Sequence, residues 1–332
     1  MKKMFSGIQP TGNVHLGNYL GAIRNWVSLQ KQYDSIFCIA DLHAITTFQQ
    51  PAGLKSKSLE LATLLMAAGI EQPSTIFVQS RVSAHAELAW IFECTTPVGW
   101  LRRMTQFKDK AESAESVSAG LFAYPALMAA DILLYRTDAV PVGEDQLQHL
   151  EITRDIAQRF NSLYGDTFNL PEAIVSEKAG RIMALDDPTK KMSKSTVETG
   201  HAIFMLDSPD GIKAKIARAT TDSHREIRFD AARPGIFNLL VIYEMLSGES
   251  RQQIESHFEG KSYSEFKEAL SEIIVVALRP IQARYRELAS APDYVRSMIE
   301  QGAEHVMPVA ETTLNLVKER MGIPQGMSRL NC

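Results

Sequence analysis

The sequence has little of the material that secreted, membrane-spanning and metal-binding proteins need. Its three cysteines, Cys38, Cys94 and Cys332, are far apart and form no Cys-x-x-Cys pair. This spacing argues against a disulfide framework and against a zinc site, so we expect incidental thiols and no protein-bound metal. The longest largely apolar run, residues 121–130, is much shorter than the ~20 residues that cross a bilayer. We therefore expect no membrane span.

Signals for export and for disorder are also missing. Two lysines follow Met1, but no continuous apolar stretch comes after them. Among 332 residues, 19 glycines and 14 prolines are too few for a fibrous or low-complexity chain. A hydrophobic share of 45% with 22% charged residues is typical of a globular protein. We expect this protein to be cytoplasmic.

A strong charge of either sign is absent as well. The formal net charge of −4 gives no global attraction to nucleic acid, so such a partner would be held by local patches. Two basic clusters are candidates, although each by itself is typical of a solvated helix face. The first comprises Arg102, Arg103, Lys108 and Lys110, and the second comprises Lys213, Lys215, Arg218, His224, Arg225 and Arg228.

Short β-branched or aromatic runs alternate with amphipathic stretches in the first half of the chain. The runs predict strands at residues 4–8, 35–40, 75–79 and 139–142. Helical spacing of apolar residues predicts helices at 17–30 and 54–68. This rhythm indicates βαβ units and therefore an α/β fold with a Rossmann-like parallel sheet.

The rest of the chain is helical in pattern. Residues 84–135 interrupt the strand and helix alternation and form a helical insertion. After a polar loop at 186–200 we expect helices at 209–219, 236–246, 263–289 and 291–321. The predicted organisation is a catalytic domain at 1–195 with its insertion at about 84–135, a smaller all-α domain at 196–295, and a terminal helix within 296–332 that packs back on the first domain.

The first predicted strand runs into a loop and then a helix, at a place suited to nucleotide binding. The loop holds Gln9, Pro10 and Thr11 and is followed by His15-Leu16-Gly17-Asn18. A helix amino terminus offers unpaired N–H groups and the positive end of its dipole to a phosphate. Gly17 would let a nucleotide approach the backbone, and His15 and Asn18 would donate to a phosphate. Taken alone, a plain turn explains the motif equally well, and it lacks the lysine of a P-loop.

A second motif lies in the loop that leads out of the predicted catalytic domain. It reads Lys191-Met192-Ser193-Lys194-Ser195. Two lysines that flank hydroxyls would stabilise the charge that accumulates on departing pyrophosphate, which favours the transition state. A solvated basic loop is the alternative interpretation of this motif by itself.

Together the two motifs resemble the signatures of class I aminoacyl-tRNA synthetases. Further segments are similar to the bacterial-type tryptophanyl-tRNA synthetase family: residues 5–10, 104–108, 124–125, 127–135 and 140–146. The resemblance extends over nearly the whole chain and is weakest after Gly322. His15 stands where that family often has Thr, and Thr196 stands where Asp is common.

The resemblance implies an enzyme that activates L-tryptophan with ATP, releases pyrophosphate and loads tRNA(Trp). Mg²⁺ would enter on the phosphates of ATP. The chain would form a homodimer through residues 84–135, and the second basic cluster would face the anticodon stem of the tRNA. Catalysis would come from positioning and charge neutralisation rather than from a protein nucleophile. The implied catalytic residues are Gln9, Lys110, Lys191 and Lys194.

ATP would lie between the two motifs and a third segment, Gly143 to Gln146. Backbone N–H groups there and the Asp145 carboxylate suit ribose hydroxyls, although a simple capping box is the alternative. The implied ATP-binding residues are Gln9, Pro10, Thr11, His15, Gly17, Asn18, Gly143, Glu144, Asp145, Gln146, Ile182, Lys191, Met192, Ser193, Lys194 and Ser195.

Tryptophan is the amino acid that the predicted helix at 125–135 suits. Met128 and Asp131 are three residues apart and share a face. An indole N–H is donor-only and matches a carboxylate acceptor, while a thioether packs on the ring. The apolar neighbours of Asp131 argue against a helix-surface carboxylate, because a lone charge there is expensive. By similarity the pocket is completed by Phe5, His43, Tyr124, Val140 and Val142.

Two other functions are compatible with parts of this pattern. A tyrosyl-tRNA synthetase shares the fold and both motifs, but its site must satisfy a phenol that both donates and accepts. A catalytically silent nucleotide-binding or RNA-binding paralogue is the second, and the presence of Lys191, Lys194 and Asp131 argues against it.

Overall fold

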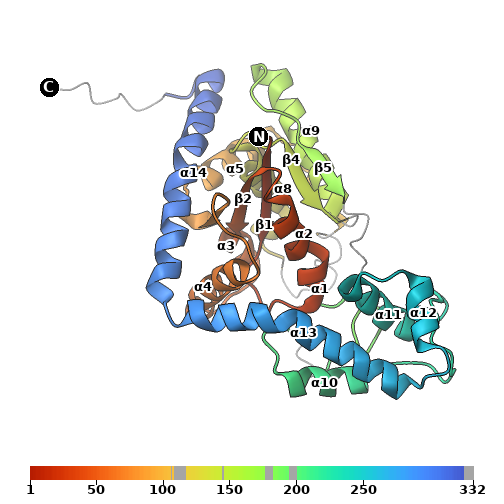
Figure 1. Cartoon of the computed structure of the whole chain (residues 1–332). Coiled ribbons are helices and arrows are strands. Elements are labelled where there is room, and N and C mark those ends of the chain that lie inside the picture. Colours follow the sequence, from red (N-terminus) through yellow and green to blue (C-terminus); the bar gives the residue numbers. More distant parts are fainter. Residues whose placement is uncertain (106, 108–116, 144–145, 176–181, 194–199, 325–332) are drawn as a thin grey trace.

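A five-stranded parallel sheet forms the centre of the molecule. The computed structural model describes residues 1–105, 107, 117–143, 146–175, 182–193 and 200–324. The strand order is β3-β2-β1-β4-β5, as Figure 1 shows. The strands are β1 (Lys3–Ile8), β2 (Asp34–Ile39), β3 (Thr75–Val78), β4 (Ala139–Val142) and β5 (Glu172–Val175). The α/β class and the Rossmann-like sheet expected from the sequence are confirmed.

The strand order reverses between β1 and β4, which makes this place the topological switch point of the sheet. β1 pairs with β2 along its whole length, from Lys3 against Asp34 to Ile8 against Ile39. On its other side β1 meets β4 through the pair Met4 and Ala139. In open parallel sheets, ligands bind beyond the carboxyl ends of the strands at such a switch point. β5 has no counterpart among the predicted strands, because it is an edge strand with mostly exposed residues and thus gives no apolar run.

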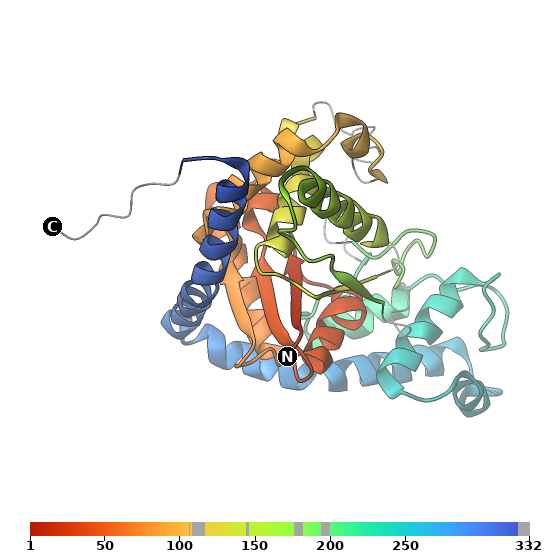
Figure 2. The same cartoon turned by 90° about the horizontal axis from the view of Figure 1, so that it is seen from above.

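Helices cover both faces of the sheet (Figure 1, Figure 2). The first part of the chain contributes α1 (Leu16–Asn18), the π-helix η1 (Tyr19–Ile23), α2 (Arg24–Leu29), α3 (Asp41–Ala44), α4 (Pro51–Ala67) and the 3₁₀ turn η2 (Gln79–Arg81). The insertion contributes α5 (Ala84–Thr95), α6 (Val98–Leu101) and α8 (Ala119–Leu133), and α9 (Leu147–Tyr164) follows β4. α8 begins six residues before the predicted start, because Ser118 caps it and Pro125 is tolerated inside it.

The later helices form a bundle beside the sheet and then return along it. They are α10 (Pro209–Arg218), α11 (Pro234–Ser247), α12 (Arg251–Phe258), α13 (Tyr263–Ala289) and α14 (Pro292–Met321). The sequence analysis missed α12, which is eight residues long with only Ile254 and Phe258 buried. α14 crosses β3 closely at Gly302, where an added Cβ would lie 2.0 Å from the Ile76 carbonyl oxygen. Only glycine allows this approach.

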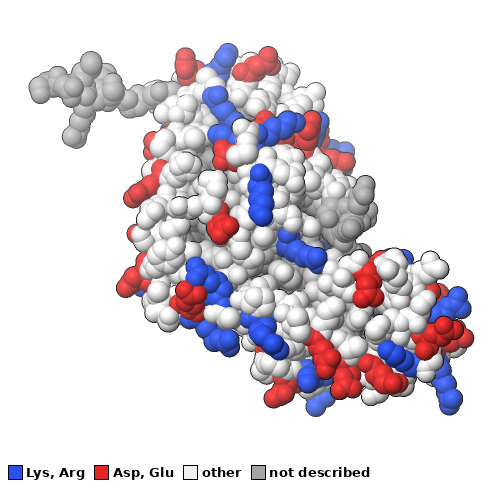
Figure 3. Space-filling view, viewed as in Figure 1, with Lys and Arg blue, Asp and Glu red and all other residues white. Residues whose placement is uncertain are grey.

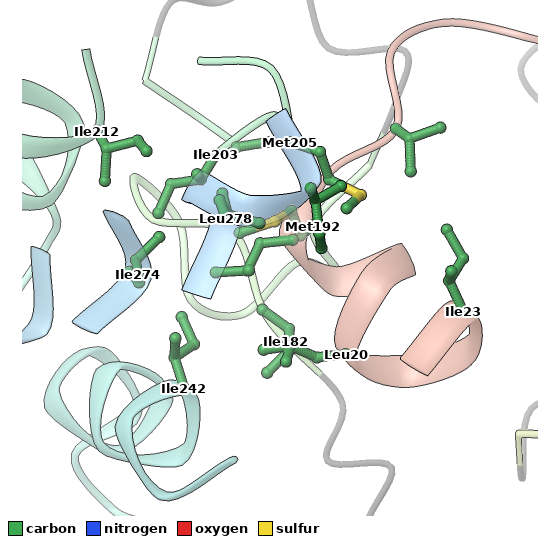
Figure 4. Packing of buried hydrophobic residues seen from close by; sticks show 14 of the residues in the cluster. Leu20, Ile23, Ile182, Met192, Ile203, Met205, Ile212, Ile242, Ile274 and Leu278 are labelled. Atoms are coloured by element: carbon green, nitrogen blue, oxygen red, sulfur yellow. The ribbon is translucent and has the colours of Figure 1, made fainter. Parts of the chain in front are cut away.

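Two apolar cores hold the layers together. One core fills one face of the sheet with α1, η1, α2 and α4 and continues into α10, α11 and α13. Figure 4 shows part of it, where Leu20 lies beside Ile182 and below Met192. The other core fills the opposite face with α5, α8, α9 and α14. Within the described ranges, no helix is long and apolar enough to cross a membrane.

Candidate active site

A pocket opens at the switch point of the sheet, beyond the carboxyl ends of β1 and β4. Its volume is about 330 Å³. All seven residues predicted for tryptophan line it: Phe5, His43, Tyr124, Met128, Asp131, Val140 and Val142. Gln9, Gly143 and Gln146, which were assigned to ATP, line the same pocket. The structure therefore brings together segments separated by more than a hundred residues in the sequence.

Asp131 lines this pocket and is 4% exposed. Its apolar neighbours would make a lone charge expensive, and three side chains donate to this carboxylate. Gln79 Nε2 and His85 Nδ1 lie 2.6 Å from Oδ1, and His43 Nε2 lies 2.7 Å from Oδ2. A carboxylate has about four acceptor positions. Three are filled without ligand, so one position remains for a further donor.

These contacts keep Asp131 ionised. Burial is the largest single effect and raises the pKa of Asp131, but the interactions with His43 and then His85 outweigh it and lower the pKa to about 2. The carboxylate is therefore an acceptor at neutral pH. Neither Gln79 nor His85 was predicted from sequence, because they are 52 and 46 residues from Asp131 and belong to separate elements.

The remaining wall of the pocket combines aromatic and aliphatic surface. Phe5 packs parallel to Tyr135, with ring centroids 5.7 Å apart. The Tyr124 hydroxyl and His149 Nε2 are 2.7 Å apart and hydrogen-bonded, and burial raises the pKa of Tyr124. His149 lines the pocket but was not predicted. The available signal was its place in α9, directly after the segment that follows β4.

His15 caps α1 and organises the first motif. Its Nδ1 accepts from the Asn18 N–H at 3.2 Å, and the Asn18 side chain accepts from the His15 N–H at 3.2 Å. A Cβ at Gly17 would lie 3.0 Å from the His15 ring and 3.5 Å from Ile182. Gly17 thus makes room for a buried histidine of its own loop, which is a different use from the nucleotide approach expected from sequence.

The segments on both sides of the lysine motif are held by backbone hydrogen bonds. The backbone N–H of Leu16 donates to the Ile203 carbonyl oxygen at 2.8 Å, and that of Met205 donates to the Val14 carbonyl oxygen at 3.0 Å. Residues 203–205, beyond the lysine motif, therefore pair with the loop that carries His15. Before the motif, Met183 and Lys191 form an antiparallel bridge. Met192 is 2% exposed and anchors this hairpin in the core, while Lys191 is exposed.

Asn238 holds this hairpin from the helical bundle and was missed by the sequence analysis. From α11 it accepts from the Met183 N–H at 2.8 Å and donates to the Met183 carbonyl at 3.0 Å. Asn238 is buried, so both backbone groups are satisfied by one amide. An asparagine within the otherwise apolar run from Ile236 to Ile242 was the signal available in the sequence.

The other predicted nucleotide residues are placed as follows. Pro10 is buried, Thr11 and Ser193 are half-buried, and Ile182 lies in the core. Five predicted site residues lie outside the described residues: Lys110, Glu144, Asp145, Lys194 and Ser195. Among the residues that the structure describes, no group of three or more His, Cys, Asp or Glu side chains could hold a metal ion.

The basic clusters are less uniform than their sequence suggests. Lys215 is held 2.6 Å from Asp207, donates to the Ala202 carbonyl and lies over the Phe204 ring. Arg228 pairs with Glu226. Figure 3 shows acidic and basic side chains interspersed over the helical bundle at its lower right. Lys215 therefore stabilises the fold locally rather than adding to an open basic surface.

Comparison with known proteins agrees with this geometry. A family model described as tRNA synthetases class I (W and Y) matches residues 1–279. A tryptophan–tRNA ligase of Wolinella succinogenes is 54% identical over 324 residues, which make up 97% of this chain and 99% of that protein. A tryptophan–tRNA ligase of Helicobacter pylori is 52% identical with the same coverage.

Solved structures give the same result. The tryptophanyl-tRNA synthetase of Mycoplasma pneumoniae superposes with a TM-score of 0.91 at 38% identity, covering 100% of both chains. The Campylobacter jejuni enzyme, crystallised with ADP and tryptophan, superposes with a TM-score of 0.83 at 36% identity, covering 96% of this chain and 99% of that one. This chain therefore belongs to the class I tRNA synthetases of the tryptophan and tyrosine family.

Proposed function

We propose that this chain is a tryptophan–tRNA ligase, which activates L-tryptophan with ATP and transfers it to tRNA(Trp). The observation that carries the proposal is the pocket at the switch point of the sheet. It combines an ionised, buried Asp131 with Met128 and Phe5, and it continues toward Gln9 and Gly143. An indole would place its ring on the apolar wall and its N–H at the remaining acceptor position of Asp131.

In this proposal the tryptophan carboxylate attacks the α-phosphorus of ATP and pyrophosphate leaves. No protein nucleophile takes part, so the enzyme works by alignment and by neutralising charge. Gln9 lies at the pocket wall near the reacting groups. Lys191, Lys194 and Lys110 neutralise the charge of the phosphates, and Mg²⁺ is carried on the phosphate oxygens. The activated acyl group then passes to the 2′-hydroxyl of the terminal adenosine of the tRNA.

ATP occupies the space between the first motif and the hairpin of residues 183–191. Three features support this placement: the α1 amino terminus, the position of Ile182 3.5 Å from where a Cβ of Gly17 would lie, and the backbone pairing of residues 14–16 with 203–205. Adenine lies along Ile182. The ribose meets Gly143 to Gln146, with Asp145 as its acceptor.

The enzyme is a homodimer that uses the insertion at residues 84–135. Apolar side chains exposed on this part of the surface support it, since such residues mark contact surfaces. Trp90 is 66% exposed and Val98 54%, and Ile45 and Phe48 before the insertion are 58% and 84% exposed. The helical domain at 196–295 then meets the anticodon side of the tRNA, and the terminal helix within 296–332 packs back on the catalytic domain at 1–195, as α14 does on β3.

Amino-acid-dependent exchange of pyrophosphate into ATP tests the proposal. Purified protein should catalyse exchange with tryptophan and give little exchange with tyrosine or phenylalanine. Charging of tRNA(Trp) should follow in the same preparation. Exchange with tyrosine in place of tryptophan would make the chain a tyrosyl enzyme, and no exchange with any amino acid would make it a silent paralogue.

A further inference from the structure

Behind Asp131 lies a chain of buried polar side chains. His85 Nε2 and the Tyr135 hydroxyl are 2.6 Å apart, and His85 Nδ1 is 2.6 Å from Asp131 Oδ1. Gln79, His85 and Tyr135 are each 0% exposed, and none of them lines the pocket. The hydrogen bonds of His85 and Tyr135 can therefore reach a ligand only through Asp131.

The hydroxyl of Tyr135 determines which nitrogen of His85 carries the proton. Among the residues that the structure describes, His85 is the hydrogen-bond partner of that hydroxyl. If His85 were protonated on both nitrogens, the hydroxyl would have to accept, and its own proton would be buried without an acceptor. The hydroxyl therefore donates to Nε2. His85 is then neutral, and its proton sits on Nδ1, from which it donates to Asp131.

This arrangement makes the two oxygens of Asp131 different. Oδ1 receives two donors, from Gln79 and His85, which fill both of its acceptor positions. Oδ2 receives only His43, which itself lines the pocket. The open acceptor position is therefore on Oδ2, on the pocket side. The carboxylate cannot rotate without breaking two buried hydrogen bonds, each of which is costly to leave unmade.

Aromatic packing holds the side chains of His85 and Tyr135 in place. The His85 ring packs against Phe77 with centroids 5.8 Å apart, and Tyr135 packs edge-on against the same Phe77. Tyr135 also supports the back of Phe5, whose other side lines the pocket. The network and the apolar wall are thus one packed unit built from β1, β3, α5 and α8.

We propose that His85, oriented by Tyr135, is a positioning residue for tryptophan specificity: with Gln79 it holds Oδ1 of Asp131 and leaves the open position of Oδ2 for an indole N–H. The inference rests on the proposed binding of tryptophan at Asp131. The hydrogen bonds of His85 and Tyr135 act only through that carboxylate, and neither residue takes part in ATP binding.

Substitutions that separate hydrogen bonding from packing test this inference. In pyrophosphate exchange, His85→Leu should raise KM for tryptophan about tenfold and lower the preference for tryptophan over phenylalanine, with KM for ATP unchanged. His85→Asn keeps a donor near the position of Nδ1 and should recover most of the loss. Tyr135→Phe keeps the ring and should give the same change at about two- to fivefold.

A matched control removes buried ring volume from the same core without touching the chain. Phe160→Leu lies in that core and is fully buried, so it should lower stability and leave both KM values and the selectivity unchanged. Nitrogen-15 NMR of histidine-labelled protein should show His85 as the neutral Nδ1–H form. An unchanged KM for tryptophan in His85→Leu, or equal losses in KM for tryptophan and ATP, overturns the inference. A wild-type protein without tryptophan-dependent exchange overturns the proposed function instead.

Discussion

The end of the site that we propose for the indole comprises Phe5, His43, Tyr124, Met128 and Asp131 and is held by side chains. The end that we propose for the nucleotide comprises residues 9–18 and 182–193 and is held by backbone. We call them the indole end and the nucleotide end. At the indole end, buried donors fix one carboxylate from three directions. At the nucleotide end, residues 14–16 pair with residues 203–205, and Asn238 holds Met183.

The difference matches two tasks. Discrimination between similar amino acids requires a polar group whose position is set in advance, because an unmatched buried polar group carries the penalty. Phosphate binding and transfer rely on backbone N–H groups and on cations that meet charge as it develops. Substitutions at the two ends should therefore separate into losses of selectivity and losses in the ATP-dependent step.

Lys194→Ala should give the largest effect at the nucleotide end. The loss of a cation on departing pyrophosphate should slow adenylate formation about 100- to 1000-fold, while the affinity for tryptophan changes little. Single-turnover kinetics and tryptophan fluorescence titration measure the two quantities. Lys190→Ala is the matched control, because Lys190 lies near the same motif but pairs with Asp187 at 3.0 Å, and it should be close to wild type. Equal losses in the rate of adenylate formation and in the affinity for tryptophan would contradict the separate tasks of the two ends.

Asn238→Ala should have the next largest effect. The change leaves both backbone groups of Met183 without their partner, so the hairpin that leads into the lysine motif loses its tie to α11. KM for ATP should rise about tenfold and KM for tryptophan should stay within about twofold. Asn238→Asp keeps only an acceptor and should lie in between. A rise in KM for tryptophan alone would contradict this assignment.

Gly17→Ala should give a smaller loss of the same kind. The new Cβ would press on the His15 ring at 3.0–3.1 Å and disturb the cap of α1. We expect KM for ATP to rise several-fold. Gly21→Ala lies in the next turn with no atom within 4 Å of the new Cβ, so it should be neutral. A neutral Gly17→Ala would show that the histidine cap is not needed for ATP binding.

The indole end also shows which residues could be predicted from the sequence and which could not. The helical spacing of Met128 and Asp131 and the similarity of five further residues identified the pocket, because local periodicity and motifs are written in consecutive residues. Gln79 and His85 could not be found in that way. They reach Asp131 only after β3, α5 and α8 pack together, and a histidine in an apolar helix has no local mark that separates a core residue from a positioning one.

At the nucleotide end, the two motifs were recognised and expected to meet the same nucleotide, but the backbone pairing beside them was not predicted. The pairing of residues 14–16 with 203–205 joins segments that flank the whole first domain, and no periodicity predicts it. Gly17 was linked to a ligand, whereas its closest neighbour is the ring of His15. Which neighbour a glycine makes room for depends on the tertiary structure, so it cannot be predicted from the sequence alone.

The smallest predicted effect concerns acid stability and compares one aspartate from each end. The pKa of both Asp131 and Asp187 is lowered to about 2. Because the folded-state pKa of about 2 is below the ordinary 3.8, the ionised carboxylate stabilises the fold fully above pH 3.8. This stabilisation is lost as the pH falls from 3.8 toward 2. Asp131 is buried, whereas the Asp187 side chain is 38% exposed, so solvent screens its contacts. Urea unfolding between pH 6 and pH 3 should therefore show a shallower acid decline for Asp131→Asn than for wild type, with Asp187→Asn parallel to wild type. A decline for Asp131→Asn as steep as that of wild type would mean that the buried carboxylate does not titrate below its ordinary range, and the network behind it would then lack the strength assigned to it here.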